Sequence, residues 1–193
     1  MLSFSGIAEL YSAVLVAFLE RMPLQPSSDA TLLIHTARLE LEPILPVHAT
    51  EMFPVLNDPA LHTFTGGSPP ATVEQLAQRY TKLASRRSPD GSELWYNWLM
   101  RDQTQRVAIG YMQSTVTSTH AYIAWVVGTA WQGQKFAAEA AQAVVTWLEA
   151  QGVSEIRACV NPRHASSQGV ARRAGLLRTN QLNDGEEVWV RKP

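Results

Sequence analysis

The fold is decided by the stretch WQGQKFAAEA, residues 131–140 of the chain. An apolar segment typical of a buried strand, residues 120–127, comes before it, and an alanine-rich segment typical of a helix follows as far as Gly152. The pattern predicts a strand, a glycine turn and a helix start. The first N–H groups of a helix have no partner inside it, and the helix dipole adds about half a positive charge there. We therefore expect an anionic ligand, such as a phosphate group, at residues 132–138.

A glycine turn also serves as an ordinary strand-to-helix connection, so the binding interpretation needs a second block of sequence. That block is VNPRHASSQGVARRAGL, residues 160–176. Its strand is predicted to end at Asn161, because Pro162 forbids continuation, and a helix with a terminal Gly175 follows. Two strand–turn–helix blocks therefore follow each other in the chain.

Together these blocks resemble the GNAT superfamily of N-acetyltransferases, and within it the RimJ/RimL-like branch of ribosomal-protein acetyltransferases. The family's pyrophosphate turn, Gln/Arg-x-x-Gly-x-Gly/Ala, is matched by the residues from Gln132 to Ala137. The family's opening Thr-x-Arg-Leu-x-Leu resembles residues 36–41, and the resemblance covers residues 31–193. The family's second block, Asn-Pro-x-Asn-x-x-Ser-x-x-Val-x-x-x-x-Gly-Phe, is matched by Asn161, Pro162, His164, Ser167, Val170, Gly175 and Leu176.

The resemblance implies acetyl-coenzyme A, or another acyl-coenzyme A, as co-substrate and no metal. It implies a primary amine as acceptor, either the N-terminus of a peptide or protein or a small-molecule amine. The pantetheine arm is expected along the strand before the turn, where a backbone N–H of Val126 or Val127 polarises the thioester carbonyl. The implied coenzyme-binding residues are Trp125, Val126, Val127, Gln132, Gly133, Gln134, Lys135, Phe136, Ala137, Ala138, Asn161 and His164.

Two of these residues depart from the family pattern. Lys135 stands where the family usually has glycine, so its side chain either turns outward or adds a point charge to the phosphate contacts. His164 replaces the second asparagine and can donate one hydrogen bond there. Asn161 is compatible both with a hydrogen bond to pantetheine and with a simple turn before Pro162.

The reaction needs an acid for the thiolate and a base for the ammonium proton. By resemblance the acid is Ser167, whose alternative role is to cap the helix that begins near Ser166. No Asp or Glu lies in the strand before the turn, so the candidate bases are Glu93, His120 and Glu40. A site without a strong base suits an α-amino group, or another amine of low pKa, better than a lysine side chain.

Composition indicates one soluble, enzyme-sized domain. The net charge of −1, from 16 basic and 17 acidic residues, argues against a nucleic-acid partner. The single cysteine, Cys159, excludes an internal disulfide and a multi-cysteine metal site. It favours a core thiol in a reducing compartment, which we take to be the cytoplasm.

Residues 1–30 are predicted to form an N-terminal amphipathic helix and linker, before a GNAT-like acyltransferase domain over residues 31–193. Apolar residues recur every three or four positions over residues 3–22, in a run too short for a signal peptide or a membrane span. The helix is compatible with packing on its own domain, with a homodimer contact, or with a membrane-surface or carrier-protein contact. A natural start at Met22 would remove it.

The remaining elements complete an α+β fold, with a mixed, mostly antiparallel central sheet flanked by helices and the extra N-terminal helix. Thr72 is expected to cap its helix. The pattern predicts strands over residues 32–41, 93–101 and 107–116, helices over residues 46–56 and 72–86, and a closing hairpin over residues 177–190.

Three functions fit these observations. The first is an N-acyltransferase that uses acetyl-coenzyme A, and the second is the same enzyme with a longer acyl chain. The third, suggested by Lys135 and the lack of an obvious base, is a catalytically silent module that binds acyl-coenzyme A. The dependence of activity on acyl-chain length separates the first two, and binding without turnover would favour the third.

Overall fold

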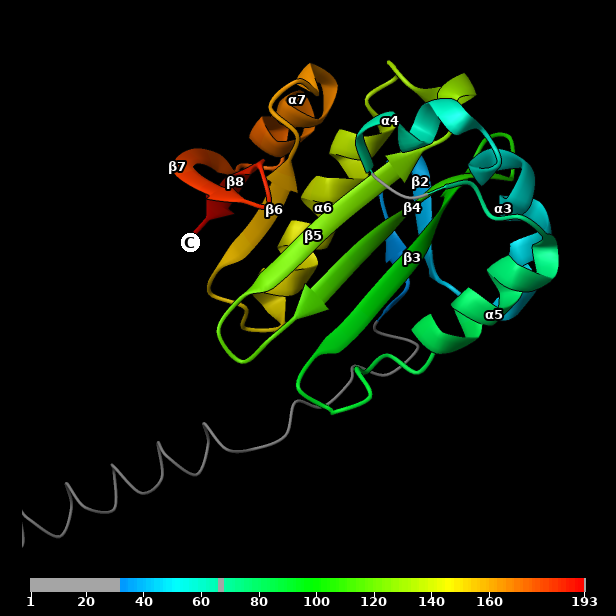
Figure 1. Cartoon of the computed structure of the whole chain (residues 1–193), viewed down its shortest axis with the longest axis horizontal. Helices are drawn as coiled ribbons and strands as arrows, with labels where there is room; N and C mark the ends of the chain where they lie inside the picture. The colour runs from blue at the N-terminus through cyan, green and yellow to red at the C-terminus, as the bar shows by residue number, and fades with distance from the viewer. Residues whose placement is uncertain (1–31, 66–67, 193) are drawn as a thin grey trace, which may run out of the picture.

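The computed structural model describes residues 32–65 and 68–192. Within these residues, eight strands form one sheet in the order β1-β2-β3-β4-β5-β6-β8-β7 (Figure 1). Adjacent strands run antiparallel except β5 and β6, which are parallel. The predicted α+β fold with a mixed, mostly antiparallel sheet is confirmed. The strands are β1 Ile34–His35, β2 Leu39–Pro43, β3 Leu94–Asp102, β4 Val107–Val116, β5 Ala121–Val127, β6 Ile156–Val160, β7 Leu177–Asn183 and β8 Glu186–Arg191.

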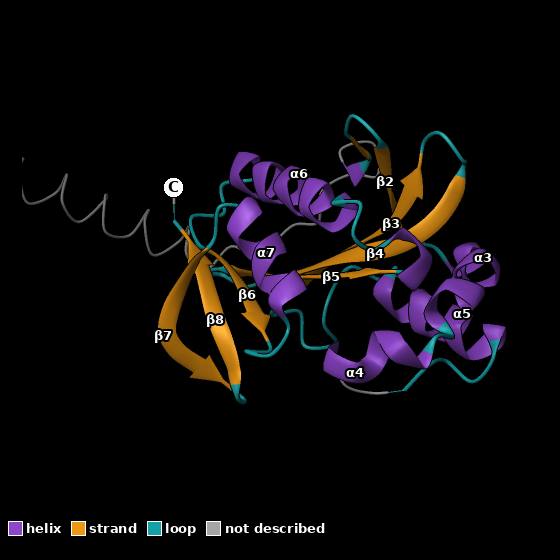
Figure 2. Ribbon diagram, turned by 90° about the horizontal axis from the view of Figure 1, so that it is seen from above, coloured by secondary structure: helices purple, strands orange, loops and turns teal. Residues whose placement is uncertain are grey.

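Helices cover both faces of the sheet (Figure 2). The long helix α6 and the following α7 lie on one face, and α3, α4 and α5 lie on the other. The α-helices are α3 Ala49–Leu56, α4 His62–Thr65, α5 Val73–Leu83, α6 Phe136–Ala150 and α7 Ala165–Arg173. Short 3-10 helices are η1 Pro46–His48, η2 Pro59–Leu61 and η3 Thr129–Trp131.

Strand β3 shows why both faces are covered. Trp98 and Met100 are fully buried on the α6 side, whereas Leu99 between them is fully buried against α3 and α5. Successive side chains of a strand point to opposite faces, so a strand that is apolar at each position needs a layer on each side. Trp98 packs edge-on against Trp147 of α6, with ring centroids 5.4 Å apart.

The predicted single strand over residues 32–41 is wrong. The chain reverses between β1 and β2, which pair antiparallel with Ile34 opposite Leu41. Thr36 closes the turn: its N–H donates to the carbonyl of Leu39 at 2.8 Å, and its hydroxyl accepts from the N–H of Leu39 at 2.8 Å. A side chain that bonds to nearby backbone competes with extended structure, and apolar alternation does not reveal this competition.

The other described elements lie close to their predicted bounds. Thr72 caps α5 as predicted, because its hydroxyl accepts from the N–H of Gln75 at 3.1 Å. The predicted helix over residues 3–22 and its linker lie outside the described residues. No helix in the described part of the chain is both long enough and apolar enough to cross a membrane.

Candidate active site

The sheet opens between β5 and β6. These parallel strands pair only at their beginnings, where Ala121 lies opposite Ile156 and Tyr122 lies opposite Arg157. On its other edge, β5 stays paired with β4 along its whole length. The last residues of β5 therefore have a partner strand on one edge only, and their other edge borders a gap.

The hydrogen-bond pattern of β5 shows which backbone groups face this gap. The N–H of Gly128 donates to the carbonyl of Ile109 at 2.8 Å, so these two residues form a hydrogen-bonded pair with β4. Such pairs alternate along an antiparallel ladder, and the next one contains Val126. The backbone groups of Trp125 and Val127 therefore point away from β4, into the gap. Of the two amides considered for the thioester carbonyl, that of Val127 faces the gap and that of Val126 does not.

The gap is the floor of a cleft with a volume of about 490 Å³. One wall is formed by η2 and α4, the other by α7, and the turn before α6 closes its end. Figure 1 shows α4 and α7 at the same end of the sheet, beside the end of β5. Most residues of the predicted site line the cleft, namely Trp125, Val126, Val127, Gln132, Gly133, Lys135, Phe136, Ala137, Ala138, His164 and Ser167. Gln134, Asn161, Glu93 and His120 are not among the lining residues.

The turn before α6 contains two left-handed residues, Gly133 with φ of 75° and Lys135 with φ of 68°. Glycine adopts this conformation freely, whereas for a residue with a Cβ it costs about 1–2 kcal/mol. Lys135 is the N-cap of α6, and the N–H of Glu139 makes the first helical bond to its carbonyl at 3.1 Å. The N–H groups of residues 136–138 therefore have no acceptor inside the helix and lie at its positive end, where an anion binds well.

Two residues outside the predicted site, Arg38 and Glu139, support this turn. Arg38 donates from Nε to Oε2 of Glu139 at 2.7 Å and from Nη1 to the carbonyl of Gln134 at 3.1 Å. The hydroxyl of Thr36 donates to Oε1 of Glu139 at 2.6 Å. Burial alone would raise the pKa of Glu139, but the hydrogen bonds from Thr36 and Arg38 outweigh it and hold the pKa below its usual value. The charged carboxylate thus ties the β1–β2 turn to the first turn of α6.

Ser167 lies in the first turn of α7, across the gap from Trp125. The indole Nε1 of Trp125 donates to the Oγ of Ser167 at 3.3 Å. The alternative role of Ser167 as a helix cap is wrong, because the N-cap of α7 is His164 and no side chain caps that end. A serine hydroxyl that accepts one hydrogen bond still has its own O–H to donate. Ser167 therefore offers a proton donor to the cleft.

The turn between β6 and α7 uses Asn161 and positions His164. Oδ1 of Asn161 accepts from the N–H of Arg163 at 3.0 Å, and its carbonyl accepts from the N–H of His164 at 2.8 Å. These bonds support the turn role of Asn161. The ring of His164 stacks on Phe64 of α4, with centroids 4.4 Å apart and planes inclined by 15°. Burial lowers the pKa of His164, so a neutral imidazole bridges the two walls of the cleft at neutral pH.

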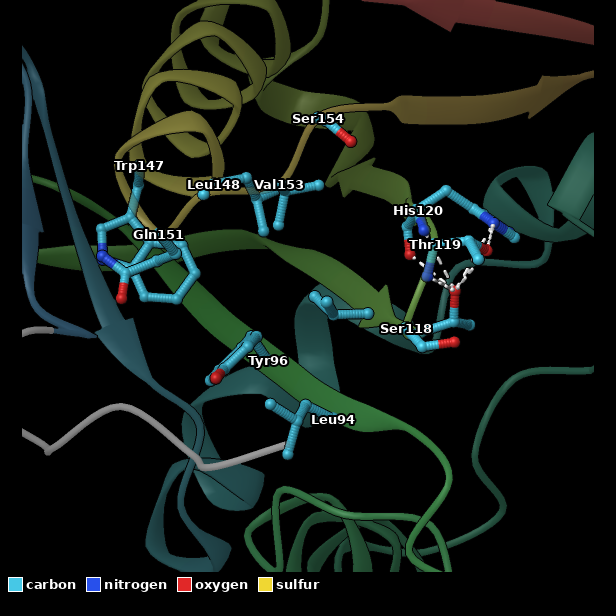
Figure 3. A pocket seen from close by; sticks show the side chains of 13 residues that line it. Leu94, Tyr96, Ser118, Thr119, His120, Trp147, Leu148, Gln151, Val153 and Ser154 are labelled. Atoms are coloured by element: carbon cyan, nitrogen blue, oxygen red, sulfur yellow. Dashed lines mark hydrogen bonds between the residues drawn. The ribbon is translucent and has the colours of Figure 1, made fainter. Parts of the chain in front are cut away.

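A second cavity, of about 240 Å³, lies at the other end of β5 and contains His120 (Figure 3). Nδ1 of His120 lies 2.8 Å from the hydroxyl oxygen of Thr119, and burial lowers the pKa of the imidazole. The strand from Ala121 to Val127 spans about 20 Å at the usual rise per residue. His120 is therefore too far from the amide of Val127 to take a proton directly from an amine bound there.

The other candidate bases also lie outside the cleft. Glu93 directly precedes β3, whose first residue, Leu94, lines the second cavity (Figure 3). The carboxylate of Glu93 accepts from Nε1 of Trp95 at 2.8 Å. Glu40 lies in β2, where its Oε2 is 3.4 Å from Nδ1 of His35. The structure does not bring Glu93, His120 or Glu40 to the gap beside β5.

The charged groups that line the cleft are basic. Lys135 and Arg173 are among its lining residues, and the described lining contains no Asp or Glu. Within residues 32–65 and 68–192, no group of three His, Cys, Asp or Glu is placed to hold a metal ion. A helix start and basic side chains beside an open strand edge suit a ligand that is anionic at one end and extended at the other.

Solved structures share this fold at low sequence identity. RimL, a ribosomal L7/L12 alpha-N-protein acetyltransferase in complex with coenzyme A, gives a TM-score of 0.70 at 18% identity, over 83% of this chain and 97% of that chain. The ribosomal-protein-S5-alanine acetyltransferase from Vibrio fischeri gives 0.68 at 16% identity, over 83% and 96% of the two chains. AAC(6')-Ib in complex with ribostamycin and coenzyme A gives 0.64 at 15% identity, over 80% and 93%.

Sequence comparison shows the family. No protein of curated function matches the chain. The sequence model of the acetyltransferase (GNAT) domain matches residues 38–177, which include the open strand, the turn before α6 and all of α7. The chain therefore belongs to the GNAT acetyltransferase family, whose members transfer an acetyl group from acetyl-coenzyme A to an amine.

Proposed function

We propose that this enzyme acetylates an α-amino group, or another amine of low pKa. In this proposal acetyl-coenzyme A lies along the open edge of β5, with its diphosphate at residues 132–138 and its thioester beside Val127. The choice of amine rests on one observation: no Asp or Glu is among the described residues that line the cleft. An amine that is bound there must lose its proton without help from a carboxylate of the lining.

The proposed reaction is direct attack. The amine nitrogen bonds to the thioester carbonyl carbon, and the carbon–sulfur bond breaks. In this proposal the N–H of Val127 donates to the carbonyl oxygen as negative charge develops on it, and the direction of this amide away from β4 supports the role. The leaving thiolate takes the proton of the Ser167 hydroxyl, and Ser167 regains a proton through water from the ammonium formed in the attack.

The cost of deprotonating the acceptor decides which amines react. At pH 7 this cost is about 4–5 kcal/mol for a lysine side chain and about 1 kcal/mol for an α-amino group. The difference corresponds to a factor of several hundred in the fraction of reactive amine. The name of the RimL relative, an alpha-N-protein acetyltransferase, agrees with an α-amino acceptor.

Two peptides that differ only in which amine they offer test this proposal. One carries a free N-terminus and no lysine, and the other carries a blocked N-terminus and one internal lysine. We expect kcat/KM for acetylation to be about several hundred-fold higher for the free N-terminus, from the difference in amine pKa. Equal rates, or a preference for lysine, would contradict the proposed acceptor. Repeating the assay with longer acyl-coenzyme A substrates separates acetyl transfer from long-chain transfer.

We further propose that the enzyme works in the cytoplasm and does not bind nucleic acid. The single cysteine and the net charge of −1 support these two points. The predicted amphipathic pattern over residues 3–22 supports a homodimer contact through that segment. The mass in solution of the full chain, compared with that of a chain starting at residue 31, tests this contact, and an unchanged monomer in both would rule it out.

A further inference from the structure

The strained residue of the coenzyme turn sits between two contacts from a distant part of the chain. Lys135 holds a left-handed backbone with φ of 68° and ψ of 12° at the N-cap of α6. A non-glycine residue keeps such a conformation only when its surroundings hold it there. Within the described residues, Arg38 of the β1–β2 turn bonds to the chain on both sides of Lys135.

On one side, Arg38 fixes the peptide unit that precedes Lys135. Nη1 of Arg38 donates to the carbonyl of Gln134 at 3.1 Å. The carbonyl of Gln134 and the N–H of Lys135 belong to the same planar trans peptide, so they point in opposite directions. A guanidinium that holds the carbonyl therefore turns the N–H of Lys135 away from Arg38.

On the other side, Arg38 is anchored to the first turn of α6. Its Nε and Nη2 both lie 2.7 Å from Oε2 of Glu139, and its backbone N–H donates to Oε1 at 2.9 Å. The guanidinium carbon also lies 4.4 Å from the ring centroid of Phe136. A planar guanidinium has donors in a fixed fork, and it can serve a carboxylate and a carbonyl at the same time. The same side chain thus spans the strained residue from Gln134 to Glu139.

We propose that Arg38 is a positioning residue for coenzyme binding, because it clamps the turn from Gln134 to Glu139 in the shape that presents the N–H groups of residues 135–138 to the diphosphate. This inference rests on the proposed site of the coenzyme. Arg38 itself touches no reacting atom. Lys135 can occupy this position because the clamp maintains its left-handed backbone.

A double-mutant cycle in coenzyme affinity tests the clamp. The variants are Arg38→Met, Lys135→Gly and the pair, and calorimetry measures the Kd of coenzyme A and of S-acetylpantetheine, which has no diphosphate. We expect Arg38→Met to weaken coenzyme A binding about 10-fold, the scale of one lost charge-assisted contact, and to leave S-acetylpantetheine unchanged. In the Lys135→Gly background the loss should shrink to within about threefold, because glycine needs no clamp.

The urea unfolding of the same four proteins separates the clamp from the proposed function. Arg38→Met should shift the unfolding midpoint about twice as far in the wild-type background as in the Lys135→Gly background. Lys192→Met, which removes a surface ion-pair partner of Glu155, is the control and should change neither Kd. The clamp would be overturned if Arg38→Met weakened the binding of coenzyme A and S-acetylpantetheine equally. It would also be overturned if Arg38→Met weakened coenzyme A binding equally in the wild-type and Lys135→Gly backgrounds. Wild-type protein that binds no coenzyme A would contradict the proposed coenzyme site. If urea unfolding of the four proteins still shows that the effects of Arg38→Met and Lys135→Gly depend on each other, the role of Arg38 in holding the backbone of Lys135 stands.

Discussion

The two ends of β5 offer similar chemical groups but differ in backbone pairing. At its beginning, Ala121 and Tyr122 pair with β6 beside the cavity that contains His120. At its end, the amide of Val127 points into the cleft that is lined by His164. Each end has a cavity, a histidine and hydroxyl groups, but only the second has a free strand edge beside the start of a long helix. Backbone direction, more than residue type, marks the end where a coenzyme fits.

A carboxylate in the turn before α6 should separate the two ends most sharply. Ala137→Asp places a negative charge in the first turn of α6, within the cleft lining. Asp is favoured at a helix N-terminus, so the fold is expected to persist. Two unit charges about 4 Å apart near a protein surface interact by about 4 kcal/mol, so the variant should repel a diphosphate strongly. We expect calorimetry to show an affinity for coenzyme A that is lower by about 100-fold or more.

The matched change at the other end of β5 is Ser118→Asp, which adds the same charge to the lining of the second cavity. Its affinity for coenzyme A should stay within about twofold of the wild type, because the two ends are about 20 Å apart. Thermal unfolding checks that both variants are folded. Wild-type affinity in Ala137→Asp would remove the turn from the site, and a large loss in Ser118→Asp would place the coenzyme at the wrong end.

Removing the proton donor should have the next largest effect. Ser167→Ala deletes the hydroxyl that accepts from Trp125 and faces the cleft. We expect kcat to fall about 10- to 100-fold. This is a small effect for the loss of a general acid, because a thiolate is a good leaving group. The Kd of acetyl-coenzyme A should change less than about threefold. Steady-state kinetics and calorimetry measure the two quantities.

The comparison variant for Ser167→Ala is His120→Ala in the second cavity. It should keep kcat within about threefold, since β5 holds the imidazole about 20 Å from Val127. A large fall in kcat for His120→Ala, with none for Ser167→Ala, would reverse the assignment of the two ends.

Most of the fold could be predicted from the sequence because burial on two faces leaves a clear pattern. Strand β6 ends at Val160, one residue before its predicted end at Asn161, and α6 ends at Ala150, two residues before the Gly152 that was expected to follow the helix. The turn at Thr36 was not predictable from that pattern, because local bonds from the backbone and the hydroxyl of Thr36 to Leu39 close it. Apolar periodicity reports burial and says nothing of such local bonds.

The candidate site was predictable only in part, for a different reason. The turn residues are contiguous in the sequence, and so the glycine and the helix start identify them together. Arg38 and Glu139 meet across 101 positions of sequence, and neither residue type signals the other. His120 and Glu93 have suitable chemistry, but which end of a strand faces the ligand depends on where β5 and β6 separate, and this is a property of the whole sheet.

The smallest expected effect is on the pH dependence of stability. Burial lowers the pKa of His164, so in the folded protein it titrates below its unfolded value of about 6.5. Above that pH the imidazole is neutral in both states, and its contribution to stability is fully present. As the pH falls below about 6.5, the unfolded chain takes up the proton first, and the free energy of unfolding decreases. Urea unfolding at two pH values, about one unit above and one unit below the unfolded pKa, measures this decrease.

The same experiment compares the two ends of β5, because burial also lowers the pKa of His120. His164→Asn removes the titrating group from the cleft, and His120→Asn removes it from the second cavity. Each variant should lose less stability than the wild type between the two pH values. Because the ends are about 20 Å apart, the two reductions should add in the double variant. Reductions that fail to add would show that the open and the paired ends of the strand are coupled. If His164→Asn instead loses as much stability as the wild type between the two pH values, the stack of His164 on Phe64 does not bury the ring in solution.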